Sequence, residues 1–114
     1  MTLAFAECYA LKYIYPINVS NTTDFSRIFA GSGNIIDARL YGLKANIDLS
    51  PCPKLRKECL MYIITNANPT TAITITLHAT AYANLAEDAE IMAKLEERNA
   101  GLSASGGSIG LEPA

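Results

Sequence analysis

The sequence has no tryptophan and only one histidine, His78, among its 114 residues. Hydrolase triads and acid–base pairs usually draw on histidine, so its scarcity weighs against an enzyme. The three cysteines, Cys8, Cys52 and Cys59, are an odd number, and the spacing of the last two does not match a zinc-binding pair. We therefore predict a non-enzymatic protein with no catalytic residue, no metal site and no cofactor.

Charged residues are scarce as well. They make up 18% of the chain, against roughly 25% in an average soluble domain. A globule of this size has proportionally much surface, so little charge is left to cover it. This composition indicates an oligomer or assembly subunit, and a well-buried domain rich in alanine and threonine remains the alternative.

Long apolar runs are also missing. Basic residues such as Lys12, Arg27 and Arg39 interrupt every candidate before it reaches the ~18 residues that a membrane span requires. The first residues carry no basic segment of the kind that opens a signal peptide. We predict no membrane association and a location in the cytoplasm or in a virion assembled inside a cell.

The charges that are present are unevenly distributed. Residues 1–83 carry seven basic and five acidic side chains, whereas residues 84–114 carry two basic and six acidic ones. Binding to nucleic acid requires clustered cationic charge, so the acidic C-terminal region argues against it. The basic run Lys54, Arg56 and Lys57 is short and follows Pro53, which favours a solvated loop.

Alternating apolar residues predict several β-strands. Residues 3–15 place aromatic side chains on one face of a strand, although their alanines also leave a helix open. Residues 35–49 alternate with a change of phase near Gly42. That change indicates either a β-bulge or a corner between two strands at this glycine. Both geometries are typical of a sandwich or a small barrel.

Two further segments predict a hairpin. Residues 60–65 form a short apolar run, and residues 72–82 alternate between isoleucine or other apolar residues and threonine. The connection 66–71 contains asparagine and proline, which favour turns. We expect the two segments to be antiparallel neighbours.

The C-terminal region changes to a helical period. Asn84 and Glu87 resemble a capping box, which predicts a helix over about 84–100. Residues 101–114 are rich in serine and glycine and read as an arm. The predicted architecture is therefore mainly β: an antiparallel β-sandwich or small barrel in a single domain of residues 1–100, with one C-terminal α-helix, and an extended tail of residues 101–114.

Six tyrosines stand out in a chain without tryptophan. Packing on strand faces explains most of them, but tyrosine also favours subunit interfaces and carbohydrate platforms. The residues are Tyr9, Tyr13, Tyr15, Tyr41, Tyr62 and Tyr82.

These features together favour an assembly protein. The hypothesis is a small subunit of a large particle such as a virus or bacteriophage virion, of head-decoration or connector type, that binds copies of itself or a larger protein lattice through its C-terminal arm. One alternative is a stand-alone β-sandwich module that binds carbohydrate or peptide, and another is an oligomeric enzyme with a shared site near His78 or Cys8. The predicted interface consists of apolar residues of the helix and the arm, namely Leu85, Met92, Leu95, Leu102, Ile109 and Leu111.

Overall fold

The computed structural model describes residues 10–22, 25 and 29–113, and within them it contains five strands and three α-helices. In chain order these are β1 (Tyr13–Asn18), β2 (Asp37–Tyr41), β3 (Ile47–Leu49), α1 (Lys57–Asn66), β4 (Ala72–Leu77), α2 (Ala79–Leu85), α3 (Ala89–Leu102) and β5 (Ser108–Pro113), with a single 3₁₀ turn, Ser103–Ser105, before β5.

All strand pairs among the described residues are parallel, so the predicted antiparallel sandwich or barrel is wrong. Strands β1 and β2 form one sheet, and β3, β4 and β5 form another in that order. Parallel neighbours need a crossover connection, and here α1 links β3 to β4 while α2 and α3 link β4 to β5. The fold is therefore a mixed α/β arrangement.

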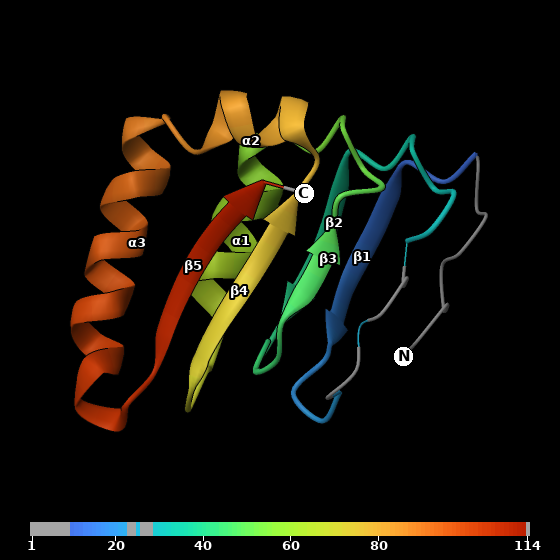
Figure 1. Ribbon diagram of the computed structural model, residues 1–114. Coiled ribbons are helices and arrows are strands. Elements are labelled where there is room, and N and C mark those ends of the chain that lie inside the picture. Colours follow the sequence, from blue (N-terminus) through green and yellow to red (C-terminus); the bar gives the residue numbers. More distant parts are fainter. Residues whose placement is uncertain (1–9, 23–24, 26–28, 114) are drawn as a thin grey trace.

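The helices surround the three-stranded sheet at different places. In Figure 1, α1 lies behind this sheet and α3 lies beside β5, while β1 and β2 stand at the end away from α3. In β4 the buried residues Ile73, Ile75 and Leu77 alternate with the half-buried Thr74 and Thr76. This confirms the alternation predicted for the strand over its first six residues.

The predicted hairpin is wrong because residues 60–65 belong to helix α1. Its buried residues are Cys59, Leu60, Ile63 and Ile64, which recur at the three-to-four spacing of a helix face. The β-branched pair Ile63 and Ile64 favours a strand locally. Burial of the whole stripe against the sheets outweighs that preference.

Of the two geometries expected at Gly42, a β-bulge or a corner between two strands, the structure has the corner. Strand β2 ends at Tyr41, Gly42 adopts a φ of 79°, and the chain then turns toward β3. A Cβ at Gly42 would lie 3.0 Å from the Cβ of Ser20, so both the left-handed conformation and the close approach require glycine.

The C-terminal region contains two helices and a strand where one helix and a tail were expected. Asn84 lies inside α2, and Asp88 is the N-cap of α3, accepting hydrogen bonds from the N–H groups of Glu90 and Ile91. Residues 108–113 pair with β4 along its whole length. The prediction of an extended tail is therefore wrong, because residues 108–113 form the edge strand of the sheet.

The first predicted strand lies partly outside the described residues, since 3–9 are not among them. Within the described part, β1 begins at Tyr13 and continues through Pro16, and its register to β2 shifts between Ile14 and Ile17. Proline has no N–H to donate and is tolerated in a strand at such an irregularity. Among the described residues, no helix combines the length and apolar character needed to cross a membrane.

Candidate functional site

Most of the predicted interface residues pack inside the protein's own core. Leu85, Leu95 and Ile109 are buried in the core, and Leu102 and Leu111 pack against it. Met92 differs, because 44% of it is exposed on α3. Of the six residues, Met92 is thus the one that a partner can reach over a large part of its surface.

Three of the residues considered for chemistry, His78, Cys52 and Cys59, occupy structural positions. The Nδ1 atom of His78 accepts the N–H of Thr80 at 3.1 Å and caps α2. Burial raises the pKa of both described thiols, Cys52 and Cys59, to about 12, which keeps them protonated and unreactive near neutral pH. Cys8 lies outside the described residues, and the described ones contain no group of three potential metal ligands.

A more accessible set of side chains lies on the outer face of β1 and β2. Ala38 and Leu40 point into the core, so the alternate residues of β2, Asp37, Arg39 and Tyr41, point outward. Tyr13 on β1 is 56% exposed and Tyr41 is 37% exposed. The same alternation that builds the core therefore gathers tyrosine and arginine on the opposite face.

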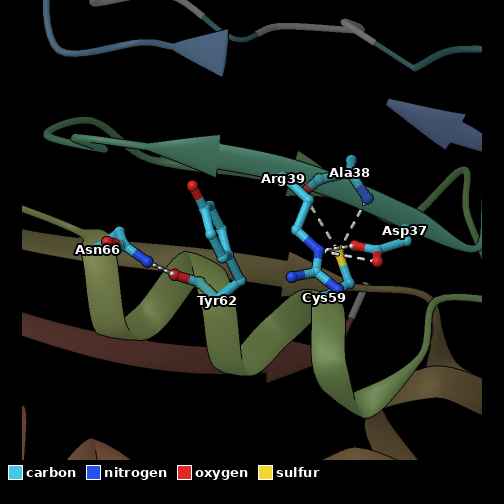
Figure 2. Close-up of polar contacts among 6 residues, drawn as sticks. All are labelled: Asp37, Ala38, Arg39, Cys59, Tyr62 and Asn66. Atoms are coloured by element: carbon cyan, nitrogen blue, oxygen red, sulfur yellow. Dashed lines mark hydrogen bonds and ion pairs between the residues drawn. The ribbon is translucent and has the colours of Figure 1, made fainter. Parts of the chain in front are cut away.

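Arg39 is held in place from two directions (Figure 2). Its Nε donates to both carboxylate oxygens of Asp37 at 3.0 and 2.9 Å, and its guanidinium carbon lies 5.2 Å from the centre of the Tyr62 ring on α1. The hydrogen bond to Asp37 raises the pKa of Arg39 above its ordinary value. Within the described part of the chain, no side chain or carbonyl accepts a hydrogen bond from its two terminal nitrogens.

Two hollows meet at Arg39. One, of about 490 Å³, is lined on α1 by Met61 and Tyr62 among others, and the second, of about 340 Å³, is lined by Tyr13, Ile14, Pro16 and Asp37. Both volumes fall in the range of roughly 300–1,000 Å³ typical of ligand pockets. We call Tyr13, Asp37, Arg39, Met61 and Tyr62 the Arg39 surface.

The larger hollow is electrically balanced. Besides Arg39, its lining includes Lys57, Glu58 and Glu90, so two positive charges face two negative ones. Lys57 is already paired, with its Nζ 2.8 Å from Glu90 and 3.5 Å from Asp88. Lys57 thus faces two carboxylates, whereas the two terminal nitrogens of Arg39 have no acceptor among the described residues.

The sequence pointed to part of this site and missed its centre. Tyr13, Tyr41 and Tyr62 belong to the tyrosines singled out as possible interface residues, whereas Tyr9 and the side chain of Tyr15 lie outside the described part. Arg39 was not singled out. The sequence feature that could have indicated Arg39 is its spacing from Asp37. Residues i and i+2 lie on the same face of a strand, so the two opposite charges are expected to be neighbours.

A scan against protein-family models finds no match to this chain, and searches of curated proteins and of solved structures find none either. The comparisons identify no family.

Proposed function

We propose that this is a non-enzymatic assembly protein that binds a second copy of itself through the Arg39 surface. The observation that carries the proposal is the position of Arg39, fixed by Asp37 and Tyr62 at the junction of two hollows. A side chain that is already oriented loses little conformational entropy when a partner binds.

The residue types of this surface support a protein partner. Tyrosine, arginine and methionine are enriched in protein interfaces, and arginine and tyrosine recur among the residues that contribute most to binding. Tyr13 exposes more than half of its surface, although it is a large apolar side chain. The low charged fraction of 18% points the same way.

The proposal differs from the expected route of assembly. Residues 101–114 do not form the free arm that this route needs, because most of the segment forms the end of α3 and strand β5. The more specific role in a virion relied on that arm, and no feature of the Arg39 surface favours it. What remains is self-association through a different face.

The test is the mass of the protein in solution, measured by light scattering after size exclusion over an about tenfold range of concentration, since self-association follows mass action. We expect a mass that rises toward a multiple of 12.2 kDa. Arg39→Ala should remain closer to the monomer mass. Arg56→Ala is the matched control, because Arg56 is exposed and lies in the lining of neither hollow.

Two results would overturn the proposal. One is a monomer at every concentration, which would favour the stand-alone binding module instead. The other is an Arg39→Ala variant that associates as the unchanged protein does, which would place the contact on another face.

A further inference from the structure

The smaller of the two hollows carries one charge of each sign. It has a volume of about 340 Å³ and is lined by Tyr13, Ile14, Pro16, Asp37 and Arg39. The carboxylate of Asp37 lies 2.9 Å from the Nε of Arg39, so the two charges largely cancel toward the hollow. A charged ligand gains little attraction there and still loses its water, which favours a neutral ligand.

The polar groups of this hollow restrict the ligand further. A guanidinium only donates hydrogen bonds, whereas an ionised carboxylate only accepts them. The terminal nitrogens of Arg39 have no acceptor among the described residues, and its Nε occupies one acceptor site on each Asp37 oxygen, which has about two. A ligand that carries neighbouring hydroxyl groups satisfies both residues, because a hydroxyl both donates and accepts.

Apolar surface lies directly beside these polar groups. Tyr13 is 56% exposed and lies opposite Asp37 in the register of β1 and β2. Pro16 is exposed as well. The flat faces of these two rings suit the C–H face of a sugar ring, whose hydroxyl groups at the rim stay available for hydrogen bonds.

A peptide is the competing ligand, because a backbone amide also donates and accepts. Extended peptides bind sheets by adding a strand at an unpaired edge. One edge of β2 pairs with β1, and on the other edge the Cys59 sulfur engages the N–H and C=O of Ala38. The hollow lies on the face of the two strands, where a compact ring is accommodated and an added strand is not.

We propose that the smaller hollow binds a neutral sugar ring, either free or at the end of a glycan. The ring packs on Tyr13 and Pro16, one hydroxyl accepts from a terminal nitrogen of Arg39, and a neighbouring hydroxyl donates to Asp37. The Tyr62 ring holds the guanidinium from the side of α1, so the donors are oriented before the ligand arrives. This site does not rest on self-association, because a single copy contains all of it.

The test is a titration of the isotope-labelled protein followed by NMR. The probes are the methyl glycosides of glucose, galactose and mannose, together with cellotriose and N,N′-diacetylchitobiose as glycan ends. We expect at least one probe to give saturable shifts at residues 13–14 and 37–39, with a dissociation constant on the order of 1 mM, as suits a small ligand in an open hollow. Tighter binding of an oligosaccharide than of every methyl glycoside assigns the site to a glycan, and equal binding assigns it to a single ring.

Substitutions show whether the hollow itself is occupied. Tyr13→Ala and Arg39→Ala should each raise the dissociation constant at least about tenfold, whereas Tyr13→Phe, which keeps the ring, should stay within about threefold of the unchanged protein. Tyr41→Ala is the matched control, because Tyr41 is a partly exposed tyrosine of the same face that lines neither hollow. It should leave the constant within about twofold, and urea unfolding verifies that each variant is folded.

Three results would overturn this assignment. They are the absence of saturable shifts with every probe up to about 50 mM, an equal loss of binding in Tyr41→Ala and Tyr13→Ala, and tighter binding of the peptide mimic N-acetylglycinamide than of every sugar.

The outcomes also separate this inference from the proposed function. A protein that associates but binds no sugar keeps the proposed function and loses this inference, and a monomer that binds a sugar does the reverse. If both hold, the sugar should raise the dissociation constant of self-association, because the ligand and the second copy both engage Arg39.

Discussion

Strands β2 and β5 are both edge strands of their sheets. A helix blocks the outer edge of each, through a cysteine at β2 and through an asparagine at β5. On β2, the backbone of Ala38 faces α1, where the Cys59 sulfur accepts its N–H at 3.2 Å and donates to its C=O at 3.4 Å. On β5, the backbone of Ile109 faces α3. There the Asn99 Oδ1 accepts its N–H at 2.7 Å and the Nδ2 donates to its C=O at 3.1 Å.

The choice of a thiol at one edge and a carboxamide at the other follows how deeply each contact is buried. The Cys59 contact is fully buried, and a thiol is inexpensive to desolvate but forms weak hydrogen bonds. The Asn99 contact is only partly buried, and its carboxamide imitates the peptide group of a further strand. In both cases one side chain satisfies the donor and the acceptor of one residue, which prevents that edge from pairing with another chain.

The two blocked edges also bear on the proposed self-association. Helix α1 seals β2 with Cys59 on its inner side and presents Met61 and Tyr62 to the larger hollow. In the proposed self-association, contacts between copies would therefore use side chains on a face and not the edge of β2 or β5. We call the contact of Cys59 with Ala38 and the contact of Asn99 with Ile109 the two seals. Their contributions to stability can be compared by replacing each side chain in turn.

The largest effect is expected from Asn99→Ala. This change leaves the N–H and C=O of Ile109 without partners in a partly buried position, where each unsatisfied group costs about 1–3 kcal/mol. We expect the free energy of unfolding to fall by about 3 kcal/mol in urea titrations.

Asn84→Ala is the control for this change, because Asn84 is an exposed asparagine on α2. A surface substitution of this kind should change the free energy of unfolding by no more than about 0.5 kcal/mol. If the two variants lose equal stability, the Asn99 carboxamide does not seal the edge of β5.

The edge of β2 should be less sensitive. Cys59→Ala removes one buried sulfur atom and two weak hydrogen bonds, and we expect a loss of about 2 kcal/mol. Cys52→Ala removes the same atom from an equally buried position, where the thiol has one hydrogen-bond partner among the described residues, the Ser32 carbonyl at 3.6 Å.

The difference between the two cysteine variants isolates the seal. Both changes leave a cavity of similar size, so we expect Cys59→Ala to cost about 1 kcal/mol more than Cys52→Ala. Equal losses in urea unfolding would mean that Cys59 contributes by packing alone.

Local sequence patterns predicted some of the strands and turns correctly, but they did not predict how the strands are arranged. The alternation in β4 and the break at Gly42 are local patterns, and both were found. Whether strands pair parallel or antiparallel depends on which crossover connects them. That crossover was missed once Ile63 and Ile64 were assigned to a strand.

The same reasoning applies to β5 and to the site. Gly107 begins the approach to β5, and a Cβ there would lie 2.6 Å from the carbonyl oxygen of Pro69, so this glycine serves a close contact and not a flexible arm. At the site, the tyrosines could be predicted from the sequence because the chain has six of them and no tryptophan. Arg39 could not, because its importance depends on Tyr62, which the fold brings to it from 23 positions further along the sequence.

The smallest effect concerns the link between the two sealing helices. Lys57 at the start of α1 lies close to Asp88 and Glu90 at the start of α3. Desolvation alone would raise the pKa of Asp88, but the N–H groups of Ile91 and Glu90 and the ammonium of Lys57 together lower it below its ordinary value of 3.8. A carboxyl group with a lowered pKa stabilises the fold above its unfolded-state pKa, and that contribution is lost as the pH falls through the folded-state value.

Asp88→Asn tests this link, because the amide oxygen can still cap α3 but does not titrate. We expect the variant to unfold at lower temperature than the unchanged protein near pH 7, and the gap to narrow as the pH falls below about 4. Glu87→Gln, which changes an exposed carboxylate beside the cap, should show a smaller gap throughout. If the gap for Asp88→Asn stays constant down to about pH 2, the charge of Asp88 does not stabilise the fold, and the ion pair between Lys57 and Glu90 is left as the link between the helices.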